Sequence, residues 1–464
     1  MSKPSIPQGT RDFSPVEVRK RQYIFKTLQT IFELYGFQPL ETPSMENLTT
    51  LTGKYGEEGD RLIFKILNNG LHEKKDADKD KLNSEWNNIL SKPYSTPVVT
   101  ERALRYDLTI PFARYVVMHQ NELSFPFRRY QMQPVWRADR PQKGRYREFW
   151  QCDADVVGST SLINEAELVS IYQTAFRKLK VPVIIKINSR KLLAALSELC
   201  GMPEKMMDIT IAMDKLDKIG WVGVANELKE RGIPDDGIWQ IERVINVKGK
   251  NDEKLAAYAD IMQHSASGME GINELSKTLA YYKELNSDEN EVNIIVDISL
   301  ARGLNYYTGV IVEVVCSSEA VKMGSIGGGG RYDDLTGLFG LKGLSGVGVS
   351  FGIDRIYDVM EELSVFPEQL VEGTKAMIVN FGGANETYAL HILQQLRAAN
   401  IVAEIYPDAA KFDKQMKYAN KRGIAYVLLP GDEEREKNMV SVKNFDTGEQ
   451  KMVSVEAAIT LLQS

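Results

Sequence analysis

The sequence contains few residues of the types that usually carry redox, metal or base catalysis. Its 464 residues include only three cysteines, Cys152, Cys200 and Cys316, and no CxxC pair. This spacing predicts reduced thiols and argues against a disulfide framework or a thiolate metal site. The four histidines adjoin neither a candidate nucleophile nor an HExxH pattern, which argues against a zinc hydrolase. We assign no side chain as a metal ligand from the sequence.

Long apolar runs are also lacking. No apolar segment reaches the length of a transmembrane helix, and the first residues, MSKPSIPQGTRDF, lack the apolar core of a signal peptide. The composition is 43% hydrophobic and 26% charged, which is typical of a globular protein. We therefore expect a cytoplasmic protein with no membrane partner and, from its length, about two to four domains.

The first part of the chain mixes a helix with extended segments. Apolar residues recur at helical spacing over residues 17–35, and Gly36 is expected to end this helix. Residues 73–81, EKKDADKDK, are charged at eight of nine positions. Such mixed charge predicts a solvated, mobile insertion.

Two later segments differ in texture from the first part of the chain. Helix formers dominate residues 189–285, which predicts a helical insertion. The last segment, from residue 375 to 464, alternates strands with helices, and this order is typical of a small α/β domain with a mainly parallel sheet.

The stretch WRADRPQKGRYREFWQ, residues 136–151, concentrates positive charge in a chain whose net charge is −6. Pro141 and Gly144 predict a turn between two strands. Strand alternation then places five side chains on one face: Arg145, Arg147, Phe149, Gln151 and Asp155. Cations, an aromatic plate, an amide and a carboxylate suit a triphosphate, a stacked base and an ammonium group. A solvated, charged hairpin explains the same pattern equally well.

Three other stretches favour a ligand site. TERALRYDLTIPFARY places Asp107 and Thr109 two residues apart, where both can face one pocket. ARGLNYYTG sets an arginine beside a glycine turn and two tyrosines, and GGGGRYDDL allows a ligand close to the backbone. GVGVSFGIDRI places Arg355 near the start of a helix, where anions are favoured. The missing GxxxxGK(S/T) pattern excludes a P-loop, and a dinucleotide site lacks its βαβ context, so we expect an antiparallel-sheet nucleotide site built from arginines.

Together these motifs resemble the class II aminoacyl-tRNA synthetases, and among them the histidyl-tRNA synthetase family. The stretch at 136–151 is similar to motif 2, and GVGVSFGIDRI to motif 3. The helix at 17–35, running to Pro43, resembles motif 1, and PQGTRDFSP the family's N-terminal signature. ARGLNYYTG and GGGGRYDDL resemble the two histidine signatures, and LRYDLTIPFARY the form of the archaeal and eukaryotic-type branch.

This resemblance implies an architecture. It is an α+β catalytic domain with an antiparallel sheet, formed by residues 1–188 and 286–365 and containing motifs 1, 2 and 3. A helical insertion domain, 189–285, interrupts it. An anticodon-binding α/β domain follows at 374–464.

The resemblance also implies an activity and its residues. The activity is ATP-dependent activation of L-histidine with Mg²⁺, followed by transfer to tRNA-His. Arg137 and Arg302 are the implied catalytic residues. The implied histidine-binding residues are Asp107, Leu108, Thr109, Arg137, Gln151, Asp155, Arg302, Tyr306 and Tyr307. The implied ATP-binding residues are Arg137, Asp139, Arg145, Phe149 and Arg355. Arg140, Gln142 and Lys143, at the loop tip, are implied to meet the tRNA acceptor end.

Adenylation explains why so few titrating residues are needed. The nucleophile is the amino acid's own carboxylate, which is ionised at pH 7, so the enzyme must stabilise phosphate charge rather than supply a base. A polar pocket that pairs both imidazole nitrogens discriminates strongly, in keeping with the absence of an obvious editing domain. Two departures from the family, Asn305 for Asp and Val312 for an aromatic, concern the electrostatics of the pocket.

The resemblance further implies a homodimer through motif 1 and an anticodon reader at the C-terminus. Residues 375–464 hold eleven basic and eleven acidic side chains, so net charge does not argue for nucleic-acid binding. Lys414, Lys417 and Lys421 share one helix face; alone, such a stripe is usually solvated, whereas the family match favours a phosphate contact. Phe412 either stacks on bases or joins the core, and we expect Tyr418 in the core.

Three rival classes share parts of this pattern. The regulatory subunit of ATP phosphoribosyltransferase resembles the fold but lacks the C-terminal domain and much of the arginine set. A synthetase-like sensing domain of a larger kinase is expected to have degenerate catalytic positions. Another class II synthetase, such as the prolyl or threonyl enzyme, lacks the two histidine signatures.

Overall fold

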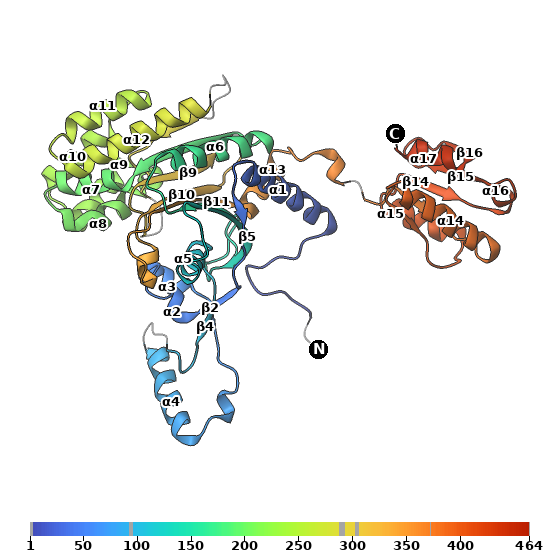
Figure 1. Ribbon diagram of the computed structural model, residues 1–464, viewed down its shortest axis with the longest axis horizontal. Coiled ribbons are helices and arrows are strands. Elements are labelled where there is room, and N and C mark those ends of the chain that lie inside the picture. The colour runs from blue at the N-terminus through green and yellow to red at the C-terminus, as the bar shows by residue number, and fades with distance from the viewer. Residues whose placement is uncertain (1–2, 92–95, 287–292, 302–305, 372, 464) are drawn as a thin grey trace. The chain divides into compact units, whose positions relative to one another are not determined.

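The computed structural model describes all residues except 1–2, 92–95, 287–292, 302–305, 372 and 464 (Figure 1). It divides into two compact units, Met1–Phe366 and Pro367–Ser464. No helix among the described residues is both long enough and apolar enough to cross a membrane.

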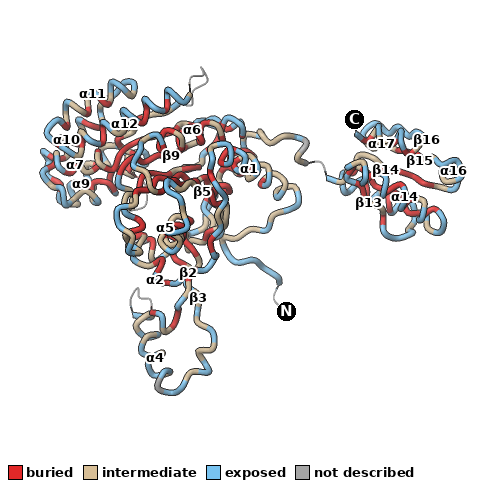
Figure 2. Tube along the Cα trace, viewed as in Figure 1, coloured by how far each residue is buried: buried red, intermediate tan, exposed pale blue. Residues whose placement is uncertain are grey.

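An eight-stranded sheet forms the centre of the first unit, and many residues of its inner strands are buried (Figure 2). In spatial order the strands are β1 (Gln38–Pro39), β5 (Phe127–Trp136), β6 (Glu148–Val157), β11 (Gly346–Gly352), β10 (Gly327–Tyr332), β9 (Val310–Cys316), β7 (Val183–Ser189) and β8 (Asn293–Val296). The pairings from β5 to β7 are all antiparallel, and only β1 and β8, at the two edges, pair in parallel. The predicted antiparallel catalytic sheet is confirmed.

The N-terminal helix forms where the sequence predicts it, but it begins two residues before and ends one residue before the predicted range 17–35. Helix α1 spans Pro15–Leu34, and Ser14 and Glu17 form a capping box at its start. Such a box satisfies two backbone N–H groups that the first turn leaves unpaired. Gly36, with φ of +78°, follows the helix end.

A three-stranded sheet and short helices lie beside the main sheet. They are β2 (Met45–Asn47), β3 (Lys65–Ile66), β4 (Arg102–Leu104), α2 (Leu48–Leu51), α3 (Gly56–Leu62) and α5 (Thr109–Met118).

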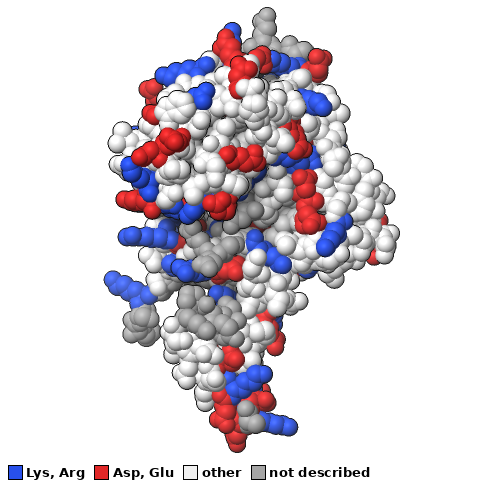
Figure 3. Space-filling model, turned by 90° about the vertical axis from the view of Figure 1, so that its left-hand side faces the viewer, with Lys and Arg blue, Asp and Glu red and all other residues white. Residues whose placement is uncertain are grey.

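The charged stretch 73–81 runs into a helix, α4 (Asp76–Ser91), which charge density alone did not predict. Acidic residues in its first turn favour helix formation, and Lys79 pairs with Asp76 at 3.3 Å. Figure 3 shows basic and acidic side chains mixed at the end of the molecule formed by α4.

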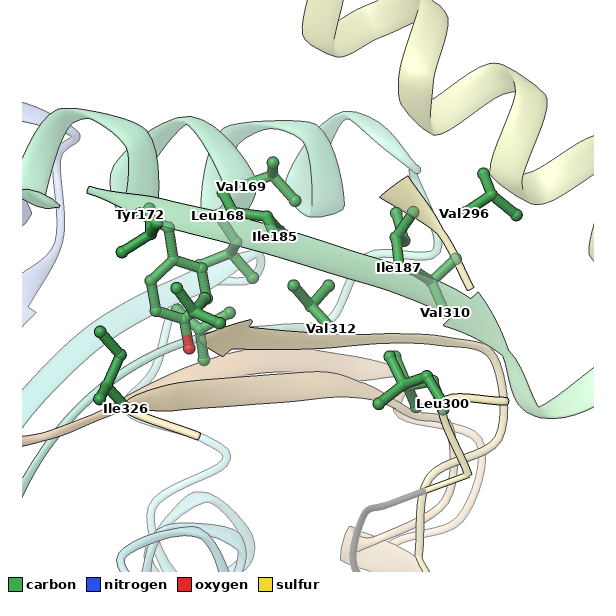
Figure 4. Close-up of a cluster of buried hydrophobic side chains, with 14 of the residues drawn as sticks. Leu168, Val169, Tyr172, Ile185, Ile187, Val296, Leu300, Val310, Val312 and Ile326 are labelled. Carbon is green, nitrogen blue, oxygen red and sulfur yellow. The ribbon is translucent and has the colours of Figure 1, made fainter. Parts of the chain in front are cut away.

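One face of the main sheet is apolar and is covered by helices. α1, α6 (Ile163–Lys178) and α13 (Ile353–Glu362) pack on this face. Figure 4 shows part of the core, where Leu168 and Tyr172 of α6 lie beside Ile185 of β7.

The opposite face of strands β5, β6 and β11 is polar, because alternate residues of a strand point to opposite sides. Residues paired across the three strands share this face: Arg129, Asp155 and Gly348; Gln131, Asp153 and Ser350; and Gln133, Gln151 and Gly352. A buried polar surface in the middle of a sheet marks the place where a ligand is expected.

The helical segment continues directly from the sheet, since α7 begins where β7 ends. Its helices are α7 (Arg190–Leu199), α8 (Met206–Met213), α9 (Leu216–Glu230), α10 (Asp235–Ile245), α11 (Asn251–Ile261) and α12 (Ala266–Leu285). Helix α12 contacts α6, α7 and β7, which joins the segment to the core of the first unit.

The second unit has its own sheet, in the order β13 (Ala403–Ile405), β12 (Ala376–Ile378), β14 (Tyr426–Leu429), β15 (Met439–Asn444) and β16 (Gln450–Ser454). Its helices are α14 (Gly383–Ala398), α15 (Phe412–Lys421), α16 (Asp432–Glu436) and α17 (Val455–Gln463). The first three strands of the sheet are parallel and the last two antiparallel. The expected mainly parallel sheet is therefore a mixed one, because residues 439–454 form a hairpin instead of a crossover.

Candidate active site

A cavity of about 250 Å³ opens beside the polar face of the sheet, between the β5–β6 loop and the start of α13. All five residues implied for ATP line it: Arg137, Asp139, Arg145, Phe149 and Arg355. Gln151, one of the implied histidine-binding residues, lines the cavity too. Residues from two distant parts of the sequence thus meet at one cavity.

Arg137 follows the end of β5 and is held by several contacts. Its Nε donates to the carbonyl oxygen of Tyr106 at 3.0 Å, and its Nη2 donates to Oε1 of Gln151 at 3.4 Å. Its guanidinium lies over the rings of Tyr106 and Phe149, 4.3 and 5.2 Å from their centroids. These contacts orient the arginine before any ligand binds.

Arg355 lies in the first turn of α13 and reaches the β5–β6 loop. Its Nε donates to the carbonyl oxygen of Gly144, and its Nη1 to that of Ser325, both at 2.6 Å. Arg145 is exposed and has its Nε 3.9 Å from Oδ2 of Asp139. Two guanidinium groups and a helix N-terminus therefore surround this end of the cavity, and both features favour phosphate.

The glycine run of β10 has two different roles. Gly327 and Gly328 line the cavity, as the sequence predicted for a ligand close to the backbone. A Cβ at Gly329 would lie 2.1 Å from the carbonyl oxygen of Gly348, and one at Gly330 would lie 2.7 Å from that of Val310. The last two glycines are needed by sheet packing rather than by a ligand.

Other implied histidine-binding residues belong to a buried acidic cluster that contains Asp107 and Asp155. Asp107 is 2% exposed, and its Oδ1 accepts hydrogen bonds from the Tyr55 hydroxyl at 2.9 Å and from the backbone N–H of Ile110 at 3.1 Å. Its Oδ2 accepts from the Tyr306 hydroxyl at 3.3 Å. Burial raises the pKa of Asp107, and these hydrogen bonds and Arg137 oppose the rise.

Asp155 is fixed by residues from two other strands, β5 and β10. Its Oδ1 accepts from the Tyr332 hydroxyl at 2.6 Å, and its Oδ2 lies 2.9 Å from Nη2 of the fully buried Arg129. The same Nη2 donates to the carbonyl oxygen of Leu108 at 3.2 Å, so Leu108 contributes its backbone. Nε and Nη1 of Arg129 have no hydrogen-bond partner among the described residues.

Thr109 and the two tyrosines complete this cluster. Thr109 is the first residue of α5 and lies near the hydroxyl of Tyr306. Tyr306 packs edge-on against Tyr307, with ring centroids 5.0 Å apart. Arg302 and Asn305 lie outside the described residues, so their implied places in the site stay predictions.

Asp153 adds a third buried carboxyl group on the same face of β6 as Asp155. Burial is the largest cause that raises its pKa, to about 7, and Asp155 adds to the rise while Arg129 opposes it. The cluster therefore carries more carboxyl groups than Arg129 can neutralise. A ligand with an ammonium and an imidazole group would supply the missing positive charge.

We expect the Asp153 carboxyl group to make stability depend on pH. Its pKa is about 7 in the folded protein and about 3.9 in an unfolded chain, so folding binds a proton between these values. Wild-type protein should lose stability relative to Asp153→Asn as pH rises from about 4 to about 7. Urea unfolding of both proteins at pH 5 and pH 8 measures this. A difference between the two proteins that does not grow with pH would contradict the assignment.

The structure corrects the expected position of Arg147 and describes the surroundings of the three loop-tip residues. Arg147, expected on the ligand face, points away: its Nε donates to the carbonyl oxygen of Asp139 at 3.1 Å, and it is not among the residues that line the cavity. The reason is that β6 begins only at Glu148, so strand alternation does not reach Arg147. At the loop tip, Arg140, Gln142 and Lys143 have other surroundings: Lys143 pairs with Glu362, and Arg140 and Gln142 are exposed.

Sequence reasoning did not single out several residues of the site. They are Tyr55, Arg129, Asp153, Tyr332 and Ser350, whose hydroxyl accepts from Nε2 of Gln151 at 2.7 Å. Strand alternation from Gln151 and Asp155 marks Asp153. Arg129, Tyr332 and Ser350 depend on which strands become neighbours, and Tyr55 depends on how the segment before α3 packs.

Comparison with known proteins decides the family. Residues 100–356 match the protein-family model described as histidyl-tRNA synthetase, and residues 375–464 match the one described as anticodon binding domain. The histidine–tRNA ligase of Christiangramia forsetii is 56% identical over 97% of this chain and 96% of its own length. That of Bacteroides fragilis is 51% identical over 99% of both chains.

The chain belongs to the histidyl-tRNA synthetase family.

Solved structures agree with this family. The crystal structure of histidyl-tRNA synthetase from Nostoc sp. PCC 7120 superposes with a TM-score of 0.80 at 28% identity, covering 100% of this chain and 99% of that one. A Bacillus halodurans protein described as an ATP phosphoribosyltransferase regulatory subunit/histidyl-tRNA synthetase has a TM-score of 0.70 at 19% identity, with 90% of this chain and 97% of that one covered, which shows a shared fold alone. The match to the anticodon-binding model over 375–464 and the high identity to the ligases argue against the regulatory-subunit rival.

Proposed function

We propose that this protein activates L-histidine with ATP and transfers the histidyl group to tRNA-His, releasing AMP and diphosphate. The observation that carries the proposal is that Arg137 lines the arginine-rich cavity and also interacts with Asp107 of the buried carboxyl cluster. The cavity with Arg145 and Arg355 suits phosphates, and the buried cluster with Asp107 and Asp155 suits the cationic groups of histidine. Arg137 lies between the cavity and the buried cluster, and it donates a hydrogen bond to Gln151.

The reaction asks this site for charge stabilisation and alignment. The histidine carboxylate attacks the α-phosphate of ATP, an acyl phosphate bond forms, and diphosphate leaves with the electron pair of the broken bond. Arg137, which lines the cavity, stabilises the charge on the α-phosphate in this proposal, together with Arg302 by family resemblance. Arg145 and Arg355 bind the outer phosphates, and Phe149 stacks on adenine.

Histidine recognition uses three buried and already hydrogen-bonded groups, Asp107, Gln151 and Asp155, and two half-buried ones, Thr109 and Tyr307. Asp107, Thr109 and Gln151 receive the α-ammonium group, while Asp155 and Tyr307 pair with the imidazole nitrogens. Tyr332 and Arg129 hold Asp155 in place. A side chain that cannot pair with these groups leaves them unsatisfied, which gives strong discrimination.

Mg²⁺ is part of the proposal as an ion that the phosphates of ATP would hold in large part, since the site supplies few carboxylates. No cluster of three or more candidate metal-ligating side chains occurs within the described part of the chain. Mg²⁺ is usually held by one or two carboxylates plus substrate phosphates, and Asp139 in the cavity fits that role. When bound, the ion would neutralise phosphate charge. The cytoplasmic location expected from the sequence stays a prediction.

We predict a homodimer formed through α1 and the strand segment after it. α1 carries the apolar side chains of Val18 and Leu34 at its surface, 38% and 72% exposed. Light scattering at micromolar concentration should give the mass of two chains. A fully active monomer at that concentration would contradict this prediction.

Gln142 tests the acceptor-stem role of the loop tip. Its side chain is exposed on the turn, where it can reach a base edge of the tRNA acceptor end. We expect Gln142→Ala to slow aminoacylation while histidine-dependent pyrophosphate exchange stays near normal. Equal loss of both activities would place Gln142 in the ATP site instead.

The second unit offers a surface for the anticodon. Lys414, Lys417 and Lys421 are exposed on α15, and the exposed ring of Phe412 stacks on Phe381 with centroids 6.3 Å apart. Tyr418 packs at the edge of the core and its hydroxyl donates to Glu404 at 2.9 Å, as expected for a structural residue. Lysines and exposed aromatic rings suit phosphates and splayed bases.

Aminoacylation of tRNA-His with labelled histidine tests the proposed function as a whole. Charging should require ATP and should fail with tRNAs for other amino acids. A purified, folded protein that charges no tRNA with histidine would refute the proposal.

A further inference from the structure

The segment before α1 lies against the β5–β6 loop. The carbonyl oxygen of Gly9 accepts a hydrogen bond from the backbone N–H of Arg147 at 2.8 Å. The carbonyl oxygen of Gln8 accepts one from Nη1 of Arg147 at 3.4 Å. Arg147, which does not line the cavity, is thus engaged by the N-terminal segment.

Gly9 allows this close approach. Its φ is +85°, a backbone conformation that residues other than glycine rarely adopt. A Cβ at this position would lie 2.8 Å from Cγ of Arg147 and 3.0 Å from Cγ of Pro141. A larger residue would push the loop away from its present position.

Arg11 joins the loop to helix α13. Its guanidinium lies over the ring of Tyr146, 3.5 Å from the centroid, and pairs with the carboxylate of Asp354. It also lies 3.5 Å from a carboxylate oxygen of Asp358, which accepts a hydrogen bond from the Tyr146 hydroxyl at 2.9 Å. One arginine therefore connects a loop residue with two carboxylates of the helix.

The connected residues belong to the walls of the cavity. Tyr146 and Asp354 line it directly, and each is next in sequence to a predicted ATP-binding arginine, Arg145 or Arg355. Asp354 also accepts from the backbone N–H of Trp150 at 2.8 Å, which ties it to β6. A shift of Arg11 would therefore change the separation of the two arginines.

We propose that Gln8, Gly9 and Arg11 form an N-terminal clamp that holds the β5–β6 loop against α13, and that Arg11 is a positioning residue for ATP. This inference rests on the proposed function, since it takes the cavity to be the ATP site. The N-terminal clamp gives a role to the signature PQGTRDFSP, whose residues take no direct part in the adenylation chemistry. The clamp acts on the phosphate end of the cavity and leaves the buried histidine cluster untouched.

The test compares Arg11→Ala, Arg11→Lys and Gly9→Ala in histidine-dependent pyrophosphate exchange. The matched control is Lys20→Ala, which removes another cation that joins α1 to α13, by its 2.6 Å pair with Glu361. Arg11→Ala and Gly9→Ala should each raise the KM for ATP by about tenfold, while the KM for histidine stays within about twofold of wild type. Arg11→Lys should recover part of the loss, and Lys20→Ala should behave as wild type.

Thermal unfolding separates positioning from general destabilisation. All four variants should keep Tm within about 4 °C of each other, the scale of a 1 kcal/mol change. The inference is overturned if Arg11→Ala and Gly9→Ala match Lys20→Ala in KM for ATP. It is also overturned if KM rises equally for both substrates. An inactive wild-type protein would instead refute the proposed function itself.

Discussion

Replacing Arg137 with Ala is expected to reduce histidine-dependent pyrophosphate exchange by about 10²–10³-fold, the scale of losing one preorganised donor to transition-state charge. Arg137 is fixed between the rings of Tyr106 and Phe149 and bonded to Gln151. The guanidinium is therefore oriented before the substrates arrive, and its removal leaves the α-phosphate end of the site without that cation. The loss should appear in kcat more than in either KM.

The matched control for this change is Arg177→Ala. Arg177 is an exposed arginine near the end of α6 and lies outside the cavity, so its removal changes the net charge equally. The Arg177→Ala protein should catalyse histidine-dependent pyrophosphate exchange at the wild-type rate. Unchanged exchange in Arg137→Ala, or an equal loss in both variants, would remove Arg137 from the mechanism.

Ending the chain after Gly373 is expected to leave pyrophosphate exchange near the wild-type rate and to lower kcat/KM for tRNA-His by about 10²-fold, as for loss of one of two linked binding sites. The first unit, Met1–Phe366, has its own core, so it should fold without the second. The truncated protein should also lose its preference for the histidine anticodon. Full charging efficiency would show that the second unit is not the anticodon reader.

A charge-matched pair of variants locates the tRNA contact within the second unit. Replacing Lys414, Lys417 and Lys421 with Ala should weaken tRNA binding and flatten its salt dependence. Replacing Lys437, Lys443 and Lys451 instead removes the same charge outside α15. Equal effects of the two sets would indicate bulk charge rather than an α15 contact.

Local sequence pattern predicted the elements that depend on neighbours along the chain. The α1 helix, the turn at Pro141 and Gly144, and the position of Arg355 at a helix start all follow from spacing and punctuation. Cation and aromatic content then identified the loop that lines the cavity. These features need no knowledge of which strands pair.

The features that sequence missed depend on pairing across the sheet. Arg129 meets Asp155 only because β5 and β6 pair in one particular register, and Tyr332 reaches Asp155 from β10. Arg147 turned away because the strand starts at Glu148, three residues later than the alternation from Arg145 assumed. Register is set by packing and turn geometry together, so single-strand patterns cannot supply it.

Pyrophosphate exchange measured with each of the twenty amino acids tests the central claim most directly. The purified protein should exchange labelled diphosphate into ATP with L-histidine, and with every other amino acid only at background. The reason is that, in the proposed function, the buried carboxyl groups of Asp107 and Asp155 pair with the ammonium and imidazole groups of histidine. Exchange driven by a different amino acid, or none with histidine, would contradict the account.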